Sequence, residues 1–365
     1  MKVAIVAPLV TAIREPQCGG SQAFLSDLAS GLVDRGHEVH LYAARGSEVR
    51  GVEVIDTGVD PEALRATLYR ASAGAGACAS DAAESAFAGI YDAVGSEAYD
   101  VVHNHAFDAP AVTHATKARA PVVHTLHLPP DAGVAEALQR AAKHDPAPTL
   151  AGVSVLQARA WSELIEVAEI LPPYVPTRLI RWSSTAGDGA VFAGRLSPEK
   201  GAVEAIEIAL AAGIRIDLYG DRYDAAYARE QIDPRTADAG VFVHAGVPRK
   251  TLWEAMARAA VVLCPARWDE PFGMVAAEAQ ACGTPVVAFR RGALEEIIVD
   301  GVSGMLVAPD DIDAAADAVT RATKLSRSRC REHAESRLDL ELSIDAHEQL
   351  YRRVASVARG VAIGG

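Results

Sequence analysis

The chain has 365 residues and a formal net charge of −13, from 35 Lys and Arg against 48 Asp and Glu. This length predicts two domains of moderate size. Hydrophobic residues make up 50% of the chain and aromatic residues only 5%, as in α/β proteins with buried sheets of small aliphatic side chains. The acidic balance argues against nucleic-acid binding. We interpret the one short basic run, residues 324–331, as the solvated face of a late helix.

Cysteine placement and the N-terminal segment bear on the compartment. The five cysteines form no Cys-x-x-Cys pair and no zinc-like spacing, which favours free thiols in a reducing compartment. The first apolar run ends at Pro8, so it is shorter than a signal peptide or the roughly 18 residues of a membrane span. We expect a cytoplasmic protein without a membrane span, and contact with a membrane surface stays open.

In chain order, the first half alternates strands and helices and begins with a βαβ unit. The pattern predicts strands at residues 3–7, 39–43, 100–103 and 122–125, and a helix at residues 22–35. Polar residues follow the third and fourth strands, where open α/β sheets place ligands. We interpret the Ala-rich residues 71–89 as a helix packed on the sheet rather than a linker.

A stretch rich in Pro, Gly and Ser at residues 171–189 predicts a domain boundary. A second alternation follows, with strands at residues 190–193, 214–219, 241–244, 261–263 and 285–288, and helices at 202–212, 251–259 and 273–281. The sequence thus predicts two doubly wound α/β domains, residues 1–180 and 181–343, that face each other across a cleft. We expect the final segment, residues 344–365, to form a helix that crosses back to the first domain.

The strongest local pattern is the segment GRLSPEKG at residues 194–201, placed after a predicted strand and before a predicted helix. Arg195 can fork onto two phosphate oxygens, and Lys200 can act as a point charge. The helix N-terminus adds amide donors and its dipole. With Gly194 and Gly201 at its ends, the segment favours a diphosphate site. A plain turn with solvated charges is the alternative.

A second pattern, WDEPFGMVAAE at residues 268–278, places Glu270 and Glu278 eight positions apart across a loop-to-helix junction. Pro271 and Gly273 let the loop bend so that amide groups at the helix start face outward. A carboxylate at Glu278 can take a pair of hydroxyls, as from a ribose, and Glu270 can bind a sugar hydroxyl. Taken separately, each glutamate also fits an ordinary surface residue, so the combination carries the interpretation.

Together the two patterns resemble those of the family 4 glycosyltransferases, whose two Rossmann-like domains form the GT-B architecture. The resemblance covers almost the whole chain. Besides the two patterns, it is carried by GGSQ at residues 19–22, DVVHNH at 100–105, HTLH at 124–127, CGTPVV at 282–287 and DGVSG at 300–304.

The resemblance implies a metal-independent, retaining transferase, without a cofactor, that moves a sugar from a nucleoside-diphosphate sugar to a hydroxyl acceptor. It implies that Arg195 and Lys200 stabilise the leaving diphosphate and that Glu278 holds the ribose. Glu270 is expected to contact the donor sugar and distal phosphate. Other expected donor-binding positions are Gly19, Gly20 and Gly194, which allow close approach of backbone to phosphate, and the amides of Phe272, Gly273, Met274 and Val275.

By the same resemblance, His105 is expected near the reacting sugar, and His127 and Thr125 on the acceptor side. A buried histidine bonded to a backbone carbonyl is the alternative for each imidazole. Family members retain configuration by front-face attack, in which a donor phosphate oxygen takes the acceptor's proton. Glu270 is therefore not assigned as a covalent nucleophile. The acceptor, a small molecule, glycan or lipid-linked compound, stays unidentified, as do the donor base and sugar, and a homodimer stays open.

Two other functions remain open on this fold: a nucleotide-sugar-binding protein without turnover and a nucleotide-sugar epimerase. A nicotinamide-dependent dehydrogenase is disfavoured, because Gly-x-Gly-x-x-Gly is missing after the first strand. A glycogen-phosphorylase-like enzyme needs a cofactor lysine and a longer chain. The chain departs from many family members at residues 172–177, PPYVPT in place of a segment with Asn-Gly-Val-Asp, so contacts to the nucleotide base are not predicted.

Overall fold

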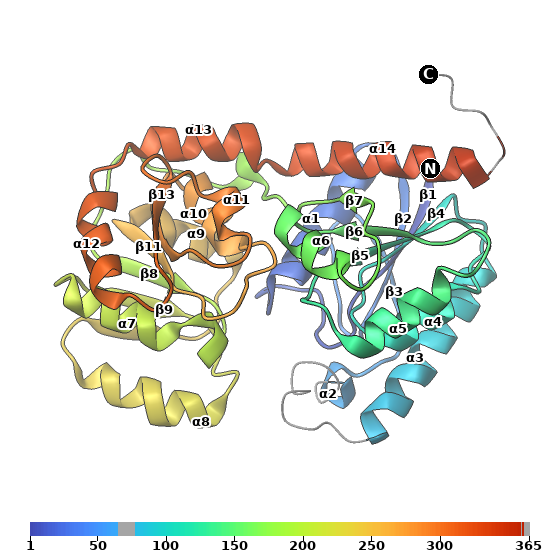
Figure 1. Ribbon diagram of the computed structural model, residues 1–365, viewed down its shortest axis with the longest axis horizontal. Coiled ribbons are helices and arrows are strands. Elements are labelled where there is room, and N and C mark those ends of the chain that lie inside the picture. Colours follow the sequence, from blue (N-terminus) through green and yellow to red (C-terminus); the bar gives the residue numbers. More distant parts are fainter. Residues whose placement is uncertain (65–76, 359, 361–365) are drawn as a thin grey trace. The chain divides into compact units, whose positions relative to one another are not determined.

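Two separate parallel sheets organise the chain in the computed structural model, which describes residues 1–64, 77–358 and 360 (Figure 1). The first unit consists of Met1–Arg14, Ser21–Pro172 and Ser343–Gly365. The second consists of Glu15–Gly20 and Pro173–Leu342. The predicted fold class of two doubly wound α/β domains is confirmed.

The first unit contains seven parallel strands in the order β3-β2-β1-β4-β5-β6-β7. The strands are β1 Lys2–Val6, β2 Glu38–Ala43, β3 Glu53–Asp56, β4 Val101–Asn104, β5 Val122–Leu126, β6 Thr149–Gly152 and β7 Glu169–Ile170. The strand order reverses between β1 and β4, so the loops that leave the carboxyl ends of these two strands diverge to opposite faces. Such a point is where doubly wound sheets bind ligands.

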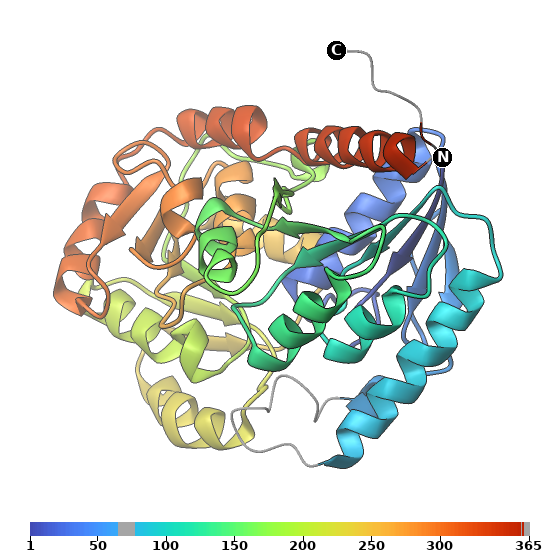
Figure 2. The same cartoon turned by 45° about the vertical axis from the view of Figure 1, so that its right-hand side comes forward.

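Helices cover both faces of this sheet. They are α1 Gly20–Asp34, α2 Pro61–Leu64, α3 Ala77–Gly95, α4 Ala109–Ala115, α5 Ala132–Ala141, α6 Val155–Ser162 and, from Ser343 on, α14 Leu340–Ala358. Figures 1 and 2 show α3 and α4 on one face and α1 and α14 on the other. Phe87 and Tyr91 of α3 are fully buried against Val102 of β4 and its neighbours. Of the helix predicted at residues 71–89, residues 71–76 lie outside the described part, and the chain is helical from Ala77.

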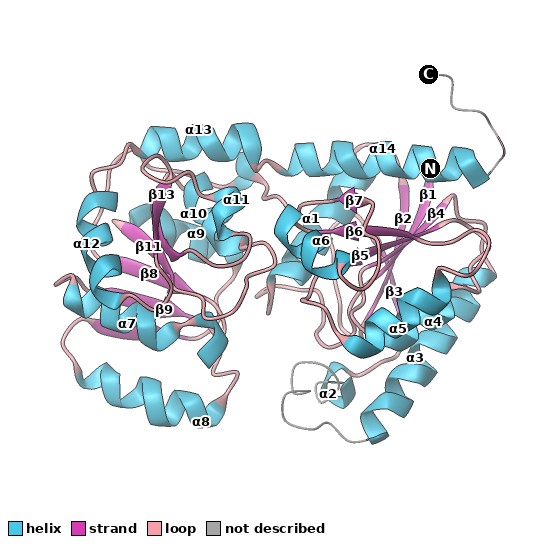
Figure 3. Ribbon diagram, viewed as in Figure 1, coloured by secondary structure: helices cyan, strands magenta, loops and turns pink. Residues whose placement is uncertain are grey.

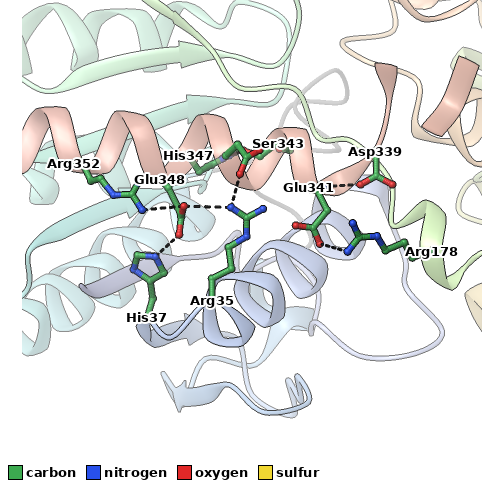
Figure 4. Close-up of polar contacts among 10 residues, drawn as sticks. Arg35, His37, Arg178, Asp339, Glu341, Ser343, His347, Glu348 and Arg352 are labelled. Carbon is green, nitrogen blue, oxygen red and sulfur yellow. Dashed lines mark hydrogen bonds and ion pairs between the residues drawn. The ribbon is translucent and has the colours of Figure 1, made fainter. Parts of the chain in front are cut away.

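The part of α14 that belongs to the first unit is held by both apolar and charged contacts. Gly31 of α1 lies so close to Ile344 that an added Cβ would be 2.3 Å from its Cδ1, so a small residue there permits the close approach of the two helices. Glu348 accepts hydrogen bonds from His37 at 2.7 Å and from Arg35 at 3.3 Å (Figure 4). On the inner side of the helix, His347 and Tyr351 are fully buried.

The second unit contains six parallel strands in the order β10-β9-β8-β11-β12-β13 (Figure 3). They are β8 Ala190–Ala193, β9 Ile216–Tyr219, β10 Val241–His244, β11 Val261–Cys264, β12 Val286–Phe289 and β13 Gly304–Val307. Its helices are α7 Ala202–Ala211, α8 Ala225–Tyr227, α9 Arg249–Arg258, α10 Met274–Ala281, α11 Leu294–Ile297, α12 Ile312–Ala322 and α13 Arg327–Arg337. The helices α7 and α12 pack on one face through Ile206 and Val319. The order reverses between β8 and β11.

The units differ in three places from the predicted domains 1–180 and 181–343, the smallest being that the second unit ends at Leu342. The change of unit falls between Pro172 and Pro173, at the start of the breaker-rich stretch. The segment Glu15–Gly20 belongs to the second unit, because the carboxylate of Glu15 accepts a hydrogen bond from the backbone amide of Arg249 at 3.0 Å. No helix in the described part of the chain has the length and apolar character needed to cross a membrane.

The interpretation of residues 324–331 as a solvated helix face is wrong for Arg327 and Arg331, which are buried. Arg327 donates to the carbonyl oxygens of Ser183, Ala257 and Ala259 and to the hydroxyl of Thr284, at 2.6 to 2.9 Å. Arg331 donates to the carbonyl oxygens of Thr177, Ile180 and Ala281. The two guanidinium groups thus supply hydrogen-bond donors to backbone carbonyl groups of the second unit. A count of charges along the sequence cannot reveal such partners.

Replacing Arg327 by Met should lower the free energy of unfolding of the second unit by roughly 3 kcal/mol or more, because three carbonyl groups and a hydroxyl lose their donor. Arg329 lies on the same helix with its side chain exposed, so Arg329→Met should change it by less than about 0.5 kcal/mol. Urea unfolding followed by tryptophan fluorescence measures both. Equal effects of the two variants would show that the buried guanidinium has no structural role.

Candidate functional site

In the second unit, the two sequence patterns meet at the reversal point of the sheet. The strands β8 and β11 are neighbours, so the loops that follow Ala193 and Cys264 leave the same edge side by side. The ammonium of Lys200, in the first loop, donates to both carboxylate oxygens of Glu270, in the second, at 3.0 and 2.8 Å. The side chains are 22% and 17% exposed, so the pair is accessible to solvent.

Trp268 contacts both members of this ion pair. Its indole Nε1 donates to Oε2 of Glu270 at 2.8 Å, and the Nζ of Lys200 lies 4.6 Å from the centroid of its ring. Sequence reasoning assigned Trp268 no role of its own. The one signal in the sequence that could have indicated a role is its position two residues before Glu270. An indole N–H can only donate a hydrogen bond, so a nearby carboxylate is a suitable partner.

Arg195 lies in the same loop as Lys200 and also faces a carboxylate. Its Nη2 is 3.1 Å from Oε1 of Glu199, and its guanidinium lies 4.8 Å from the centroid of the Tyr223 ring. The hydroxyl of Ser197 donates to the same glutamate at 2.6 Å. Each of the two cations that the sequence assigned to a diphosphate is therefore within reach of a carboxylate. A bound phosphate would exchange one anionic partner for another.

A glycine allows the two loops to approach. Gly201 lies between the short helix Pro198–Lys200 and α7. Its φ of 76° is in the left-handed region. An added Cβ there would lie 1.9 Å from the carbonyl oxygen of Pro265, in the loop after β11. Gly194 has φ of 153°, next to the extended region.

The start of α10 carries the other residues predicted to bind a donor. Gly273 precedes the helix with φ of 99°, and an added Cβ would lie 2.7 Å from Leu294. Phe272 is buried, with its ring centroid 5.9 Å from that of Tyr174. Met274 lies against Gly20, at which an added Cβ would be 3.2 Å from its sulfur. The glycine segment and the start of α10 thus belong to one unit; Gly19 and Val275 lie beside them in the chain.

Glu278 on α10 is not an ordinary surface residue, since it is only 5% exposed. Nε and Nη2 of Arg249 each lie 3.3 Å from its Oε1, and Arg249 itself is 8% exposed. The guanidinium also lies 4.7 Å from the centroid of the Trp253 ring. A buried carboxylate needs such a partner to remain charged. Sequence reasoning missed Arg249, because the partner comes from another helix 29 positions away.

In the first unit, the predicted histidines lie at the carboxyl ends of β4 and β5. His103 bonds through Nδ1 to the hydroxyl of Tyr351 at 2.6 Å and through Nε2 to that of Thr125 at 2.7 Å. Thr125 is therefore engaged inside the unit and is only 3% exposed. His105 Nδ1 lies 2.8 Å from His127 Nε2, so the structure brings these two predicted residues together.

Burial keeps these imidazoles neutral. It lowers the pKa of His127 to about 3 and those of His124 and His347 to about 4. The pKa values of His103 and His105 are lowered well below the usual 6.5, first by burial and then by the neighbouring histidines. A neutral imidazole offers one donor and one acceptor, which suits hydroxyl groups rather than anions.

Among the described residues, no group of three or more His, Cys, Asp or Glu is placed to hold a metal ion.

Two family profiles match the chain, one in each half. The profile of the group 1 glycosyl transferases matches residues 187–337, and that of Glycosyltransferase Family 4 matches residues 18–160. The D-inositol 3-phosphate glycosyltransferase of Acidothermus cellulolyticus is 30% identical over 268 residues, which cover 61% of this chain and 59% of that protein. The alignments span 26%, 59% and 32% of the length of the first three curated relatives.

Solved structures share the fold along almost the whole chain. Sucrose-phosphate synthase from Thermosynechococcus elongatus superposes with a TM-score of 0.76 at 18% identity, covering 98% of this chain and 99% of that one. Anabaena HepE in complex with UDP-glucose gives a TM-score of 0.73 at 20% identity, covering 96% and 99%. At these identities the likeness concerns the fold.

Gly201→Ala should lower the free energy of unfolding by more than about 3 kcal/mol, because the new Cβ strains a left-handed backbone and displaces the carbonyl of Pro265. Gly213 has a similar φ of 70° with no atom within 4 Å of an added Cβ, so Gly213→Ala should cost only about 1 kcal/mol. Urea unfolding of both variants checks the difference. If Gly201→Ala is no worse than the control, the loops are not held in contact at this residue.

The first unit should lose stability in acid. Because desolvation lowers the folded pKa values of His103, His105, His124, His127 and His347 below 6.5, their contribution is complete above about pH 6.5 and is lost as the pH falls toward 4, at about 1.4 kcal/mol per pH unit for each. Burial raises the pKa of Asp108 to about 7, so this one group acts in the opposite sense, with stability lost as the pH rises. Calorimetry should show a lower melting temperature for the first unit at pH 5.0 than at pH 7.5. Equal temperatures would mean that the histidines are protonated in the folded chain.

Proposed function

Because the chain belongs to glycosyltransferase family 4, we propose that it moves a sugar from a nucleoside-diphosphate sugar to a hydroxyl group of an acceptor. The observation that carries this proposal is the ion pair of Lys200 with Glu270 where the sheet order reverses between β8 and β11, in a loop that also carries Arg195. Two cations at that edge suit a diphosphate, and a carboxylate beside them suits sugar hydroxyls. The UDP-glucose bound to Anabaena HepE, a protein of the same fold, supports a nucleotide-sugar donor.

In the proposed reaction, the bond between the anomeric carbon and the diphosphate oxygen breaks, and its electron pair leaves with the diphosphate. Negative charge therefore grows on the leaving group. Arg195 and Lys200 stabilise that charge without a metal, Arg195 by forked hydrogen bonds and Lys200 as a point charge. Lys200 then shares its donors between the phosphate and Glu270, so the ion pair couples the diphosphate position to the sugar position. Trp268 keeps Glu270 oriented when Lys200 turns to the phosphate.

The nucleoside is proposed to lie toward α10. Glu278 accepts two hydrogen bonds from the ribose hydroxyls, while Arg249 balances its charge. We propose that the anomeric configuration is retained through an oxocarbenium-like state with front-face attack. The acceptor's proton then passes to a donor phosphate oxygen, so the reaction requires no nucleophile from the protein. The lowered pKa values of the histidines in the first unit agree with this, since neutral imidazoles contact hydroxyl groups without competing for the phosphate charge.

The donor site is tested by calorimetric titration with UDP and other nucleoside diphosphates. Lys200→Ala and Glu278→Gln should each weaken binding by about 10-fold to 100-fold, roughly 1.4 to 2.7 kcal/mol, because each removes a direct ligand contact. Lys250, exposed on α9, provides the control, and Lys250→Ala should bind as the unaltered protein does. Melting temperatures confirm that the variants fold. Unchanged affinity in both test variants would refute the donor assignment.

A transfer assay then separates the proposed function from its alternatives. The protein is incubated with a panel of nucleotide sugars and candidate acceptors, and release of nucleoside diphosphate and glycosylated product are followed. Product formation supports the transferase. Conversion of the donor sugar without acceptor identifies an epimerase instead, and tight binding without any turnover identifies a binding protein.

A further inference from the structure

One nitrogen of His105 has no hydrogen-bond partner among the described residues. His105 is completely buried, and its Nε2 is the atom left without a partner. A buried polar atom of this kind costs about 1 to 3 kcal/mol and needs an explanation. His105 directly follows β4, at the reversal point of the first sheet, where the fold places ligands.

The other nitrogen of His105 is fully engaged. Its Nδ1 lies 2.8 Å from Nε2 of His127, which follows β5, the strand next to β4. The ring of His103 packs against His105 with centroids 3.9 Å apart and planes tilted by 37°, and Phe24 approaches His105 edge-on with centroids 6.5 Å apart. On the far side, the ring of Phe107 meets that of His127 edge-on at 5.9 Å. The position and rotation of the His105 ring are therefore fixed by its neighbours.

Counting protons leaves two arrangements for two neutral imidazoles joined by one hydrogen bond. If His105 donates from Nδ1, its Nε2 carries a bare lone pair. If His127 donates from Nε2, His105 carries its proton on Nε2 and can donate it. A hydroxyl group can satisfy Nε2 in either arrangement, because it both donates and accepts, whereas an ammonium or a carbonyl group suits only one.

Nε2 of His124 and Nε2 of His347 are also buried without a hydrogen-bond partner among the described residues, but neither ring is bonded to a second imidazole as His105 is. Both nitrogens of His103 are taken by Tyr351 and Thr125. His347, on α14, donates from Nδ1 to the carbonyl of Ser343 at 2.7 Å. His124 bonds through Nδ1 to the side-chain amide of Asn104. Of the imidazoles packed against or bonded to His105, only His127 determines which of its nitrogens carries the proton.

We propose that His127 is a positioning residue for His105: it fixes the tautomer and ring orientation of His105 and so presents Nε2 to a hydroxyl group of the substrate. This inference rests on the proposed function, since the hydroxyl belongs to the transferred sugar or its acceptor. It differs from the expectation that His127 itself contacts the acceptor. Two residues that directly follow adjacent strands thus act as one group.

Two substitutions of His127 separate a hydrogen-bonding role from packing. His127→Phe keeps an aromatic ring beside Phe107 but removes the hydrogen bond to His105. His127→Gln keeps an amide group at the reach of Nε2, which can donate or accept. Turnover is measured as nucleoside diphosphate released from the donor identified by the panel. We expect about a tenfold loss in His127→Phe, by analogy with supporting partners of functional histidines, and nearly full rescue in His127→Gln. Affinity for UDP, which lacks the transferred sugar, should not change.

The double variant His105→Phe/His127→Phe tests whether the pair acts as one group. It should be no less active than His105→Phe alone, since His127 has no role once His105 is absent. Losses that multiply in the double variant, or a His127→Gln variant as impaired as His127→Phe, would overturn the proposal and assign His127 a direct contact with substrate.

Imidazole 15N NMR gives a readout that does not depend on turnover. The 15N shifts distinguish protonated from bare ring nitrogens, so His105 should show one tautomer in the unaltered protein and a changed distribution in His127→Phe. If no nucleotide sugar supports transfer while this change is seen, the proposed function fails and the positioning role stands. An unchanged His105 spectrum in a folded His127→Phe variant overturns the positioning role whatever the activity.

Discussion

The ion pair between Lys200 and Glu270 joins the two loops on which the proposed donor site depends. It exists because the sheet order of the second unit reverses between β8 and β11, so loops 70 residues apart in sequence leave neighbouring strands at the same edge. Gly201 permits the approach and Trp268 secures it, with a hydrogen bond to one partner and its ring beside the other. The charges stay partly exposed, which keeps the cation available to a phosphate.

The first unit uses the same strand order with different chemistry. At its reversal point the side chains are buried neutral imidazoles, and their hydrogen bonds run from α14 through Tyr351 and His103 to Thr125. Desolvation keeps protons off these rings, so the network can present donors and acceptors to hydroxyl groups without carrying charge. The side chains at the reversal point are thus charged in the unit proposed to bind the nucleotide. They are neutral imidazoles in the unit proposed to contact the sugar and the acceptor.

Features that are local in the sequence could be predicted from it. Continuous apolar runs marked most strands, and Gly194 to Gly201 and Trp268 to Glu278 marked the two loops, because strand ends, turns and helix starts depend on adjacent residues. The strands Glu53–Asp56, Thr149–Gly152, Glu169–Ile170 and Gly304–Val307 were not predicted, because each is only two to four residues long and the polar or glycine residues at their ends shorten the apolar run further. Partners that depend on tertiary packing could not be found: Arg249 for Glu278, Tyr351 for His103, and the carbonyl groups that bury Arg327. Charge in the sequence does not show whether packing will enclose it.

A nucleoside diphosphate is proposed to bind where the loops after β8 and β11 meet. A crystal structure with bound UDP tests this most directly. We predict that the diphosphate oxygens lie within hydrogen-bond distance of Arg195 and Lys200, that the bond from Lys200 to Glu270 is at least partly exchanged for one to phosphate, and that the ribose hydroxyls contact Glu278. A nucleotide bound elsewhere, with the Lys200 to Glu270 pair unchanged and Glu278 bonded only within the protein, would contradict it.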